Sequence, residues 1–440
     1  MDPYGMRYDS SWFFTCGKAW AEGLTPYIDF ADSKGPLLWL IYSLGYLLSP
    51  TSYHGVFWLS VLAYAIAFAF IWRTSRLFVG KRETLLVLCA MPLFLFFITY
   101  HNEVRAEDFC MPAICGGIYF TCSAMLTGGG KLSKDAFLLG ICMAYCLLIK
   151  WNIFFMMGGM ALLVAGISIS RRSFSGIGYG LLGIVAFLVP FFVYFLWAGN
   201  LQAFIQEYFV NTLQITDRNL FHSFPRDKVV ITALLVSLVF FCRHFCVSYW
   251  FLLAFFPFFC FLMLRSVFLH YFATAMPFTM FAVIFVANKL SAIIAKLPRS
   301  FFGVLLIMVY CGALCFNFHP TYLPMSTHPM QIRKAVMDYM TKKEQPKIMF
   351  TDGDGGQGLC ARAIPACKYW AQQKDASRQM KAAREQAVRE RRADFIVVTN
   401  LAETPIGFIP LMERSGYRQC VAPVFENGRW TMTPLPLYEK

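Results

Sequence analysis

The feature that most constrains this chain is a series of apolar runs that extends from about residue 55 to residue 318. A helix needs about 20 apolar residues to cross a bilayer core about 30 Å thick, and a series of such runs is typical of polytopic membrane proteins. The composition agrees, because 58% of the residues are hydrophobic and only 15% are charged. The chain is therefore predicted to be a polytopic α-helical membrane protein.

About ten spans are predicted, a few of them short. Their approximate limits are 55–72, 84–100, 108–126, 135–149, 153–170, 177–198, 229–242, 246–264, 268–287 and 301–318. Residues 37–48 are apolar but too few to cross the core, so we expect a re-entrant or interfacial helix there. The first residues have neither the basic start nor the apolar run of a signal peptide, and we expect that a first span is missing from this sequence.

Lysine and arginine in short loops are retained on the cytoplasmic side of a membrane. In the predicted topology, alternate loops carry Arg73/Arg76/Lys81/Arg82, Lys131/Lys134, Arg171/Arg172, Arg243 and Lys289/Lys296/Arg299. All these groups lie on one side if the N-terminal segment is outside, and an even number of spans puts the C-terminal segment outside as well. The formal net charge of +14 is explained by these loops and the C-terminal tail, so we expect no nucleic-acid partner.

Three parts are predicted: an external catalytic loop over 1–36, a transmembrane helical domain over 37–318 and a small soluble α/β domain over 319–440. In the last part, helices are expected at 330–343 and 374–392, and strands at 347–351 and 394–399. The glycine-rich residues 352–358 lack the order of a phosphate-binding loop, which disfavours nucleotide binding. A Cys360–Cys367 disulfide is an open alternative.

Ionisable side chains near a membrane core are costly, so those that share a cavity are candidates for function. On the predicted outer side these are Asp9, Asp32, Lys34, Glu103, Arg105, Glu107, Asp108, Lys150, Arg265 and His270. A carboxylate can deprotonate an acceptor hydroxyl, and cations can stabilise the charge on a leaving phosphate. The candidate bases are Asp9, Glu107 and Asp108, and the candidate cations are Lys34, Arg105 and Lys150.

Each candidate also has a plainer interpretation. Asp9 is otherwise a solvated acid in a loop, and Asp32 is otherwise the N-cap of a helix that starts at Gly35. Lys150 otherwise extends its ammonium to the membrane interface. The acids at 107 and 108 suit a helix start because of the helix dipole, and His270 suits a hydrogen-bonded interfacial position.

Residues 9–38, DSSWFFTCGKAWAEGLTPYIDFADSKGPLL, resemble a signature of the GT-C superfamily of membrane glycosyltransferases. The similarity is to bacterial members related to protein O-mannosyltransferases and aminoarabinose transferases. Residues 105–112 (RAEDFCMP), 140–152 (GICMAYCLLIKWN) and 270–277 (HYFATAMP) support it in the same order. The resemblance implies an enzyme of the bacterial inner membrane that moves a sugar from a polyprenyl-phosphate carrier to a lipid, glycan or protein acceptor outside the cytoplasm.

The resemblance also implies roles for single residues. It places Asp9 at the catalytic acid, Lys34 at the lysine near the carrier phosphate, and Glu107 or Asp108 at a second acidic site; Lys150 and His270 match recurrent positions and are binding candidates, as is Arg105. Ser10 stands where the mannosyltransferases have a second acid, so no cofactor is implied with certainty and a divalent cation is an open alternative. Ser33 stands where relatives often have histidine.

Two other functions fit the same apolar spans. A transporter or flippase of a polyprenyl-linked glycan is the main alternative, although transporters place polar residues near the bilayer midplane and often contain repeats. Here the charges lie at span ends, and the sequence shows no internal repeat. The third alternative is a scaffold that has lost activity and only binds partners.

Overall fold

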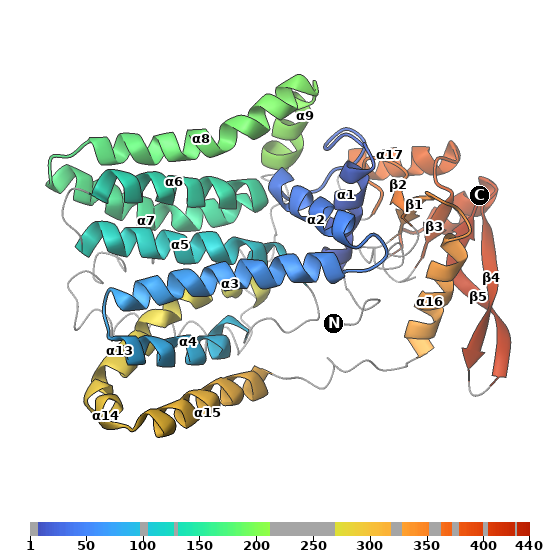
Figure 1. Ribbon diagram of the computed structural model, residues 1–440. Helices are drawn as coiled ribbons and strands as arrows, with labels where there is room; N and C mark the ends of the chain where they lie inside the picture. The colour runs from blue at the N-terminus through green and yellow to red at the C-terminus, as the bar shows by residue number, and fades with distance from the viewer. Residues whose placement is uncertain are drawn as a thin grey trace.

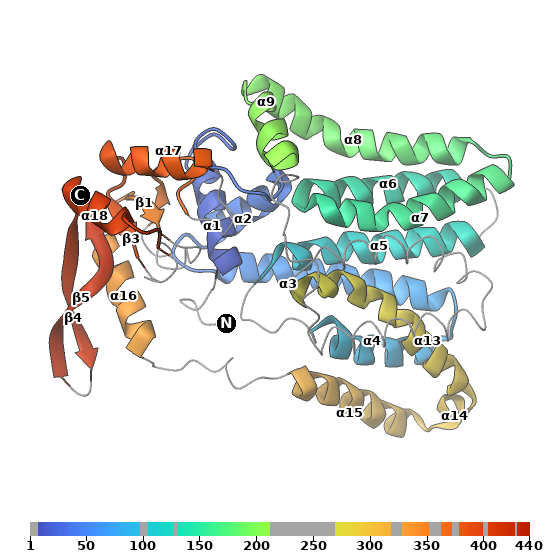
Figure 2. The ribbon, with the colours of Figure 1, turned by 180° about the vertical axis from the view of Figure 1, so that it is seen from behind.

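Figure 1 shows the computed structural model, which describes residues 8–96, 104–126, 131–211, 269–317, 328–351, 362–371, 378–398, 404–426 and 429–440. Long helices form a bundle on one side, and a sheet with its helices lies on the other. Helices α1 (Tyr8–Ala21) and α2 (Pro36–Leu48) lie between these two parts. Figure 2 shows the same arrangement from behind.

Five helices in the described part of the chain are long and apolar enough to cross a membrane. They are α3 (His54–Arg76), α5 (Ala106–Leu126), α6 (Leu132–Ile149), α7 (Trp151–Ser170) and α8 (Ser175–Trp197). The other helical elements of the bundle are α4 (Lys81–Leu95), α9 (Leu201–Phe204), the π-helix η2 (Ile205–Asn211), the 3-10 helix η3 (Leu269–Thr279), α13 (Met280–Lys289), α14 (Ser291–Lys296) and α15 (Arg299–Asn317).

The prediction of about ten spans is not confirmed. Six of the predicted runs coincide with α3 to α8, but α4 is too short to be counted as a span, and it contains Pro92. The run at 268–287 is divided between η3 and α13. The runs at 229–242 and 246–264 lie outside the described residues.

Helices α6 and α8 approach each other closely because glycines line their contact. A Cβ atom on Gly183 would lie 2.1 Å from the Phe137 carbonyl oxygen, and one on Gly140 would lie 2.1 Å from the Gly180 carbonyl oxygen. Small residues allow this approach in membranes, where packing rather than hydrophobic burial holds helices together. Away from this contact, α8 exposes apolar side chains such as Leu181 and Val193, which fits a face in contact with lipid.

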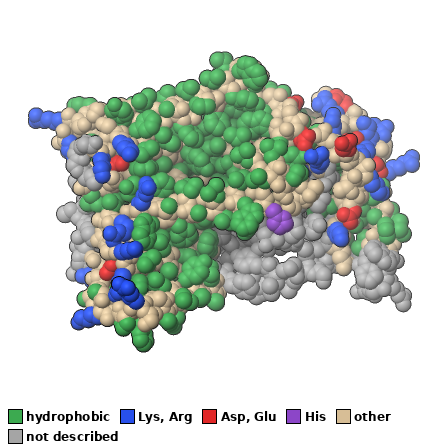
Figure 3. All heavy atoms as spheres, viewed as in Figure 1, with side chains coloured by type: hydrophobic (Ala, Val, Ile, Leu, Met, Phe, Trp, Pro, Cys, Tyr) green, Lys and Arg blue, Asp and Glu red, His purple; other side chains and the backbone are tan. Residues whose placement is uncertain are grey.

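The basic groups of the predicted cytoplasmic loops lie at one end of the bundle. Arg82 donates hydrogen bonds to the carbonyl oxygens of Ile294 and Leu297, and Arg171 donates to the carbonyl oxygen of Ala124. Figure 3 shows lysine and arginine gathered at that end, next to a broad band of hydrophobic side chains. The antiparallel helices therefore bring alternate loops together, as the sequence predicted; Arg243 lies outside the described residues.

The C-terminal part contains a five-stranded sheet in the order β2-β1-β3-β5-β4. Strands β1 (Lys347–Phe350), β2 (Ile364–Pro365) and β3 (Phe395–Val397) are parallel, and β5 (Arg429–Glu439) is antiparallel to β3 and to β4 (Arg418–Glu426). The helices of this part are α16 (His328–Met340), α17 (Arg378–Arg389) and α18 (Phe408–Arg414). The predicted helices and strands of this region are present, within a few residues. The boundaries of the three predicted parts stay predictions.

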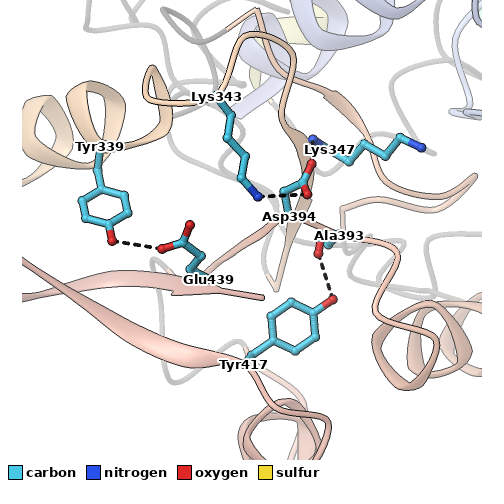
Figure 4. Close-up of polar contacts among 7 residues, drawn as sticks. All are labelled: Tyr339, Lys343, Lys347, Ala393, Asp394, Tyr417 and Glu439. Atoms are coloured by element: carbon cyan, nitrogen blue, oxygen red, sulfur yellow. Dashed lines mark hydrogen bonds and ion pairs between the residues drawn. The ribbon is translucent and has the colours of Figure 1, made fainter.

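Asp394 directly precedes β3 and connects this strand to the start of β1 (Figure 4). One of its carboxylate oxygens accepts a hydrogen bond from the Lys343 ammonium at 3.1 Å, and the other accepts from the Lys347 backbone N–H at 2.8 Å. Tyr417 donates from its hydroxyl to the backbone carbonyl just before Asp394, at 3.0 Å. These contacts hold the start of β3 against the start of β1.

The segment predicted as an external loop contains a helix, α1, which packs against α2. A Cβ atom on Gly17 would lie 2.7 Å from Tyr42, and the Ser43 hydroxyl donates to the Gly17 carbonyl oxygen at 2.6 Å. The alternative that Asp32 caps α2 is wrong: the N-cap is Gly35, and α2 has no side-chain capping hydrogen bond. The carboxylate of Asp32 instead accepts from the backbone N–H of Ser33 at 2.6 Å.

Candidate functional site

The backbone carbonyl of Val104 joins three segments that are distant in sequence. It accepts hydrogen bonds from the Ser10 hydroxyl in α1 and from the Tyr42 hydroxyl in α2, the second at 2.6 Å. Val104 directly precedes Arg105 and α5, whose first turn contains the two predicted acids. Asp9, the neighbour of Ser10, is therefore held close to the start of α5.

Residues 25–35 form a compact loop between α1 and α2. Tyr27 has a φ of 65°, which is uncommon for a residue with a Cβ atom, and its N–H bonds the Phe30 carbonyl oxygen at 2.7 Å. The Tyr27 hydroxyl donates to the Lys34 carbonyl oxygen at 3.1 Å, and Asn200 donates from its side chain to the Pro26 carbonyl oxygen at 2.9 Å. These bonds fix the path of the backbone that leads to Lys34.

Gly35 brings this loop to the end of α6. Its N–H donates to the Ile149 carbonyl oxygen at 2.9 Å, and a Cβ atom on Gly35 would lie 2.0 Å from the Leu148 carbonyl oxygen. Only glycine allows this approach without a shift of the backbone. Lys34 precedes Gly35 and Lys150 follows Ile149, so this hydrogen bond brings the backbones of the two lysines together.

Two buried carboxylates at the start of α5 are paired with groups from other segments. Glu107 forms an ion pair with Lys150, which lies between α6 and α7 with non-helical backbone angles. Asp108 accepts from the Tyr64 hydroxyl of α3 at 2.6 Å and from the Arg105 backbone N–H at 2.7 Å. Such pairing is expected, because an uncompensated charge is very costly away from water.

The candidate residues divide into a buried layer and an accessible layer. Arg105, Glu107, Asp108 and Lys150 are all less than one-tenth exposed. Asp9, Ser33 and Lys34 are partly exposed. The Lys34 ammonium contacts the Ser33 hydroxyl at 3.0 Å and lies 5.5 Å from the centre of the Phe13 ring. The accessible ionisable side chains among these candidates are therefore one acid, Asp9, and one cation, Lys34, whereas the other four are buried.

The structure brings most of the predicted site residues to one end of the bundle. Those are Asp9, Lys34, Arg105, Glu107, Asp108 and Lys150. His270 belongs to η3, but its side chain is outside the described part of the chain, as are Glu103, Arg265, the glycine-rich residues 352–358 and Cys360. No group of three or more His, Cys, Asp or Glu side chains that could hold a metal ion occurs among the described residues.

Sequence reasoning missed a second ion pair near this cluster. Glu207 of η2 is buried, and its carboxylate lies 2.6 Å from the Lys368 ammonium and 2.9 Å from the Tyr369 hydroxyl. Burial, and then the charge of Glu207, raises the pKa of the Tyr369 hydroxyl. An acid inside the mainly apolar stretch 204–210 (FIQEYFV) was the one available signal, whereas nothing in the sequence around Lys368 indicated a partner.

Residues 33–197 match the family model described as dolichyl-phosphate-mannose-protein mannosyltransferase. The fold is similar to the crystal structure of ArnT from Cupriavidus metallidurans bound to undecaprenyl phosphate, with a TM-score of 0.65, 12% identity, and coverage of 99% of this chain and 94% of that chain. The apo structure of ArnT gives a TM-score of 0.64 with the same identity and coverage. No curated protein matches the sequence. These matches confirm the predicted resemblance to GT-C glycosyltransferases.

Proposed function

We propose that this protein transfers a sugar from a polyprenyl-phosphate carrier to a hydroxyl of a lipid, glycan or protein acceptor. Asp9 takes the proton of the acceptor hydroxyl, and the oxygen then attacks the anomeric carbon of the sugar. The bond between that carbon and the phosphate oxygen breaks, and the carrier phosphate leaves with the electron pair, so the anomeric configuration is inverted. The observation that carries this proposal is that four distant segments bring Asp9, Lys34, Arg105, Glu107, Asp108 and Lys150 to one end of an apolar bundle.

The assignment of Asp9 as the base rests on access. A base must come within hydrogen-bond reach of the proton that it removes. Asp9 is partly exposed in the first turn of α1, whereas Glu107 and Asp108 are buried and bonded to Lys150, Tyr64 and the backbone. In this mechanism the two acids of α5 orient the cations around them.

The carrier phosphate is assigned to Lys34, Arg105, Lys150 and His270. Of the described residues in this set, Lys34 has the accessible cation, whereas Arg105 and Lys150 are buried and their charges are balanced by those of Glu107 and Asp108. Charge that develops on a leaving phosphate is stabilised best by groups that are already in place. A protein of the same fold, ArnT, was crystallised with undecaprenyl phosphate, which supports a carrier of this class.

The proposed location is the bacterial inner membrane, with the site on the extracytoplasmic side. The support is the distribution of charge, because lysine and arginine gather at the opposite end of the bundle and such loops stay in the cytoplasm. The lipid-facing helices would hold the prenyl tail, and membrane lipid is the surrounding solvent.

The test uses purified protein in liposomes with a panel of undecaprenyl-phosphate sugars and an acceptor fraction from cell envelopes. Release of free undecaprenyl phosphate is measured for wild type, Asp9→Asn, and the matched control Asp338→Asn, which changes an exposed acid of α16. We expect Asp9→Asn to lose a factor of about 10² to 10⁴ in rate and the control to lose nothing. A fully active Asp9→Asn protein would falsify the base assignment.

Two further measurements separate the alternatives. The assay is repeated with a chelator and then with added Mg²⁺ or Mn²⁺, which shows whether a divalent cation takes part. If no donor releases its phosphate, movement of the lipid-linked sugar across the bilayer is measured instead. Movement of the lipid-linked sugar without release of its phosphate would refute the transferase and support the transporter or flippase.

A further inference from the structure

Lys368 connects the C-terminal part of the chain to the loop that carries Lys34. Its backbone carbonyl accepts from the Ala31 N–H at 3.0 Å. The residues on either side follow the same path: the Trp370 ring packs 5.3 Å from the Trp12 ring of α1, and the Trp370 carbonyl accepts from the Phe350 N–H of β1 at 2.7 Å. Residues 368–370 thus bond the sheet on one side and the loop 25–35 on the other.

The side chain of Lys368 is fixed by the membrane part of the chain. Its ammonium lies 2.6 Å from a carboxylate oxygen of Glu207, and the Tyr369 hydroxyl donates to that same oxygen at 2.9 Å. The second oxygen of Glu207 accepts from the side-chain amide of Asn211 at 2.9 Å. A buried carboxylate held in this way is a strongly directional anchor, because its bonds form where water competes little.

The π-helix η2, which carries Glu207, also lies close to the loop 25–35 at Gly35. Tyr208, next to Glu207, donates from its hydroxyl to the Leu147 carbonyl oxygen at the end of α6. That hydroxyl would be 3.0 Å from a Cβ atom placed on Gly35. The loop 25–35 is therefore enclosed by η2, by the end of α6 and by residues 368–370.

We propose that Glu207 and Lys368 are positioning residues, which hold the loop 25–35 so that Lys34 faces the carrier phosphate. Neither side chain touches the substrate in this mechanism; each acts through the Ala31 backbone and the loop that follows it. The role in the reaction rests on the proposed function, whereas the ordering of the loop does not. The C-terminal part then completes the site by fixing the loop.

The experiment measures the loop directly. In the full-length protein in liposomes, Ser33→Cys places a thiol on the partly exposed loop, and its rate of modification by a maleimide is followed by mass spectrometry of that peptide. We expect Lys368→Met to raise this rate at least tenfold and Lys368→Arg to keep it within about threefold of the parent. The matched control is Lys343→Met, which removes the partly exposed ion pair with Asp394 and should change nothing at residue 33. Tyr369→Phe, a milder change, should raise the rate by a smaller factor.

Turnover gives the second readout. We expect kcat to fall about 10²-fold in Lys368→Met, since a displacement of about 1 Å has that effect, while KM for the donor changes little. An unchanged modification rate in both Lys368→Met and Tyr369→Phe overturns the proposal. If the wild-type protein transfers no sugar but Lys368→Met still raises the rate of maleimide modification at residue 33, the proposal that Lys368 orders the loop stands. That result refutes only the proposed function.

Discussion

Replacement of Gly35 by alanine tests whether one close contact sets the geometry of the site. Gly35 has a φ of −80° and a ψ of 159°, angles that any residue adopts, so the substitution introduces no backbone strain. The added Cβ atom would, however, lie 2.0 Å from the Leu148 carbonyl oxygen and 2.4 Å from its carbon. Real Cβ contacts are at least 3.0 Å, so the loop must move by about 1 Å away from α6.

The consequence for the reaction follows from that displacement. Lys34 moves with Gly35, and the bond from the Gly35 N–H to the Ile149 carbonyl oxygen is stretched from 2.9 Å. A misplacement of about 1 Å costs about 10²-fold in rate, and overpacking costs about 1 to 3 kcal/mol in stability. We therefore expect Gly35→Ala to fold, to melt at a lower temperature, and to release undecaprenyl phosphate about 100-fold more slowly.

The assay compares kcat and the thermal midpoint of Gly35→Ala with those of Gly166→Ala. Gly166 lies inside α7, and a Cβ atom there would meet nothing within 4 Å. Alanine is favoured over glycine within a helix by about 1 kcal/mol, so this control should be slightly more stable and fully active. A Gly35→Ala protein that retains a third or more of the wild-type rate would refute the reasoning.

Three other changes test the packing and the buried charges. Lys150→Met should cost about 3 to 5 kcal/mol in stability because it leaves the Glu107 carboxylate buried without its cation, and adding Glu107→Gln should recover part of that loss in chemical denaturation. Gly183→Ala should cost about 1 to 3 kcal/mol, because its Cβ atom would lie 2.1 Å from a carbonyl oxygen of α6, whereas Gly178→Ala, also inside α8, meets nothing within 4 Å and should be slightly more stable than wild type. Burial raises the pKa of Tyr417 to about 12 from 10.0, so the folded state holds this proton more tightly than the unfolded state does. The resulting stability is present below about pH 10 and is lost as the pH rises to about 12. In thermal melts, Tyr417→Phe should therefore lose less stability than wild type between these two pH values.

Apolar patterning along the chain predicts most of the long helices of this protein. The predicted runs at 55–72, 108–126 and 177–198 correspond to α3, α5 and α8 within a few residues. The reason is physical: a helix in lipid must bond its own backbone and present apolar side chains, so its length and limits are written in consecutive residues. Shorter elements were predicted less well, because the pattern does not distinguish α4 from a full span.

The candidate site was also predicted only in part: the sequence selected several of its residues but not the contacts between them. Motif resemblance and charge at span ends selected Asp9, Lys34, Glu107 and Lys150, although nothing local showed that Glu107 pairs with Lys150 or that α1 is a helix. Glu207 and its partners in the C-terminal part were missed entirely, since they are more than 150 residues apart in the chain.

The sequence by itself determined the membrane class, the limits of the long helices and the end of the bundle at which the basic loops gather. Tertiary structure alone decided which acid is accessible and which is buried, because that depends on contacts between segments such as Ser10 with Val104 and Gly35 with Ile149. Such contacts arise only where two backbones approach closely, and their hydrogen bonds have no periodic trace in the sequence.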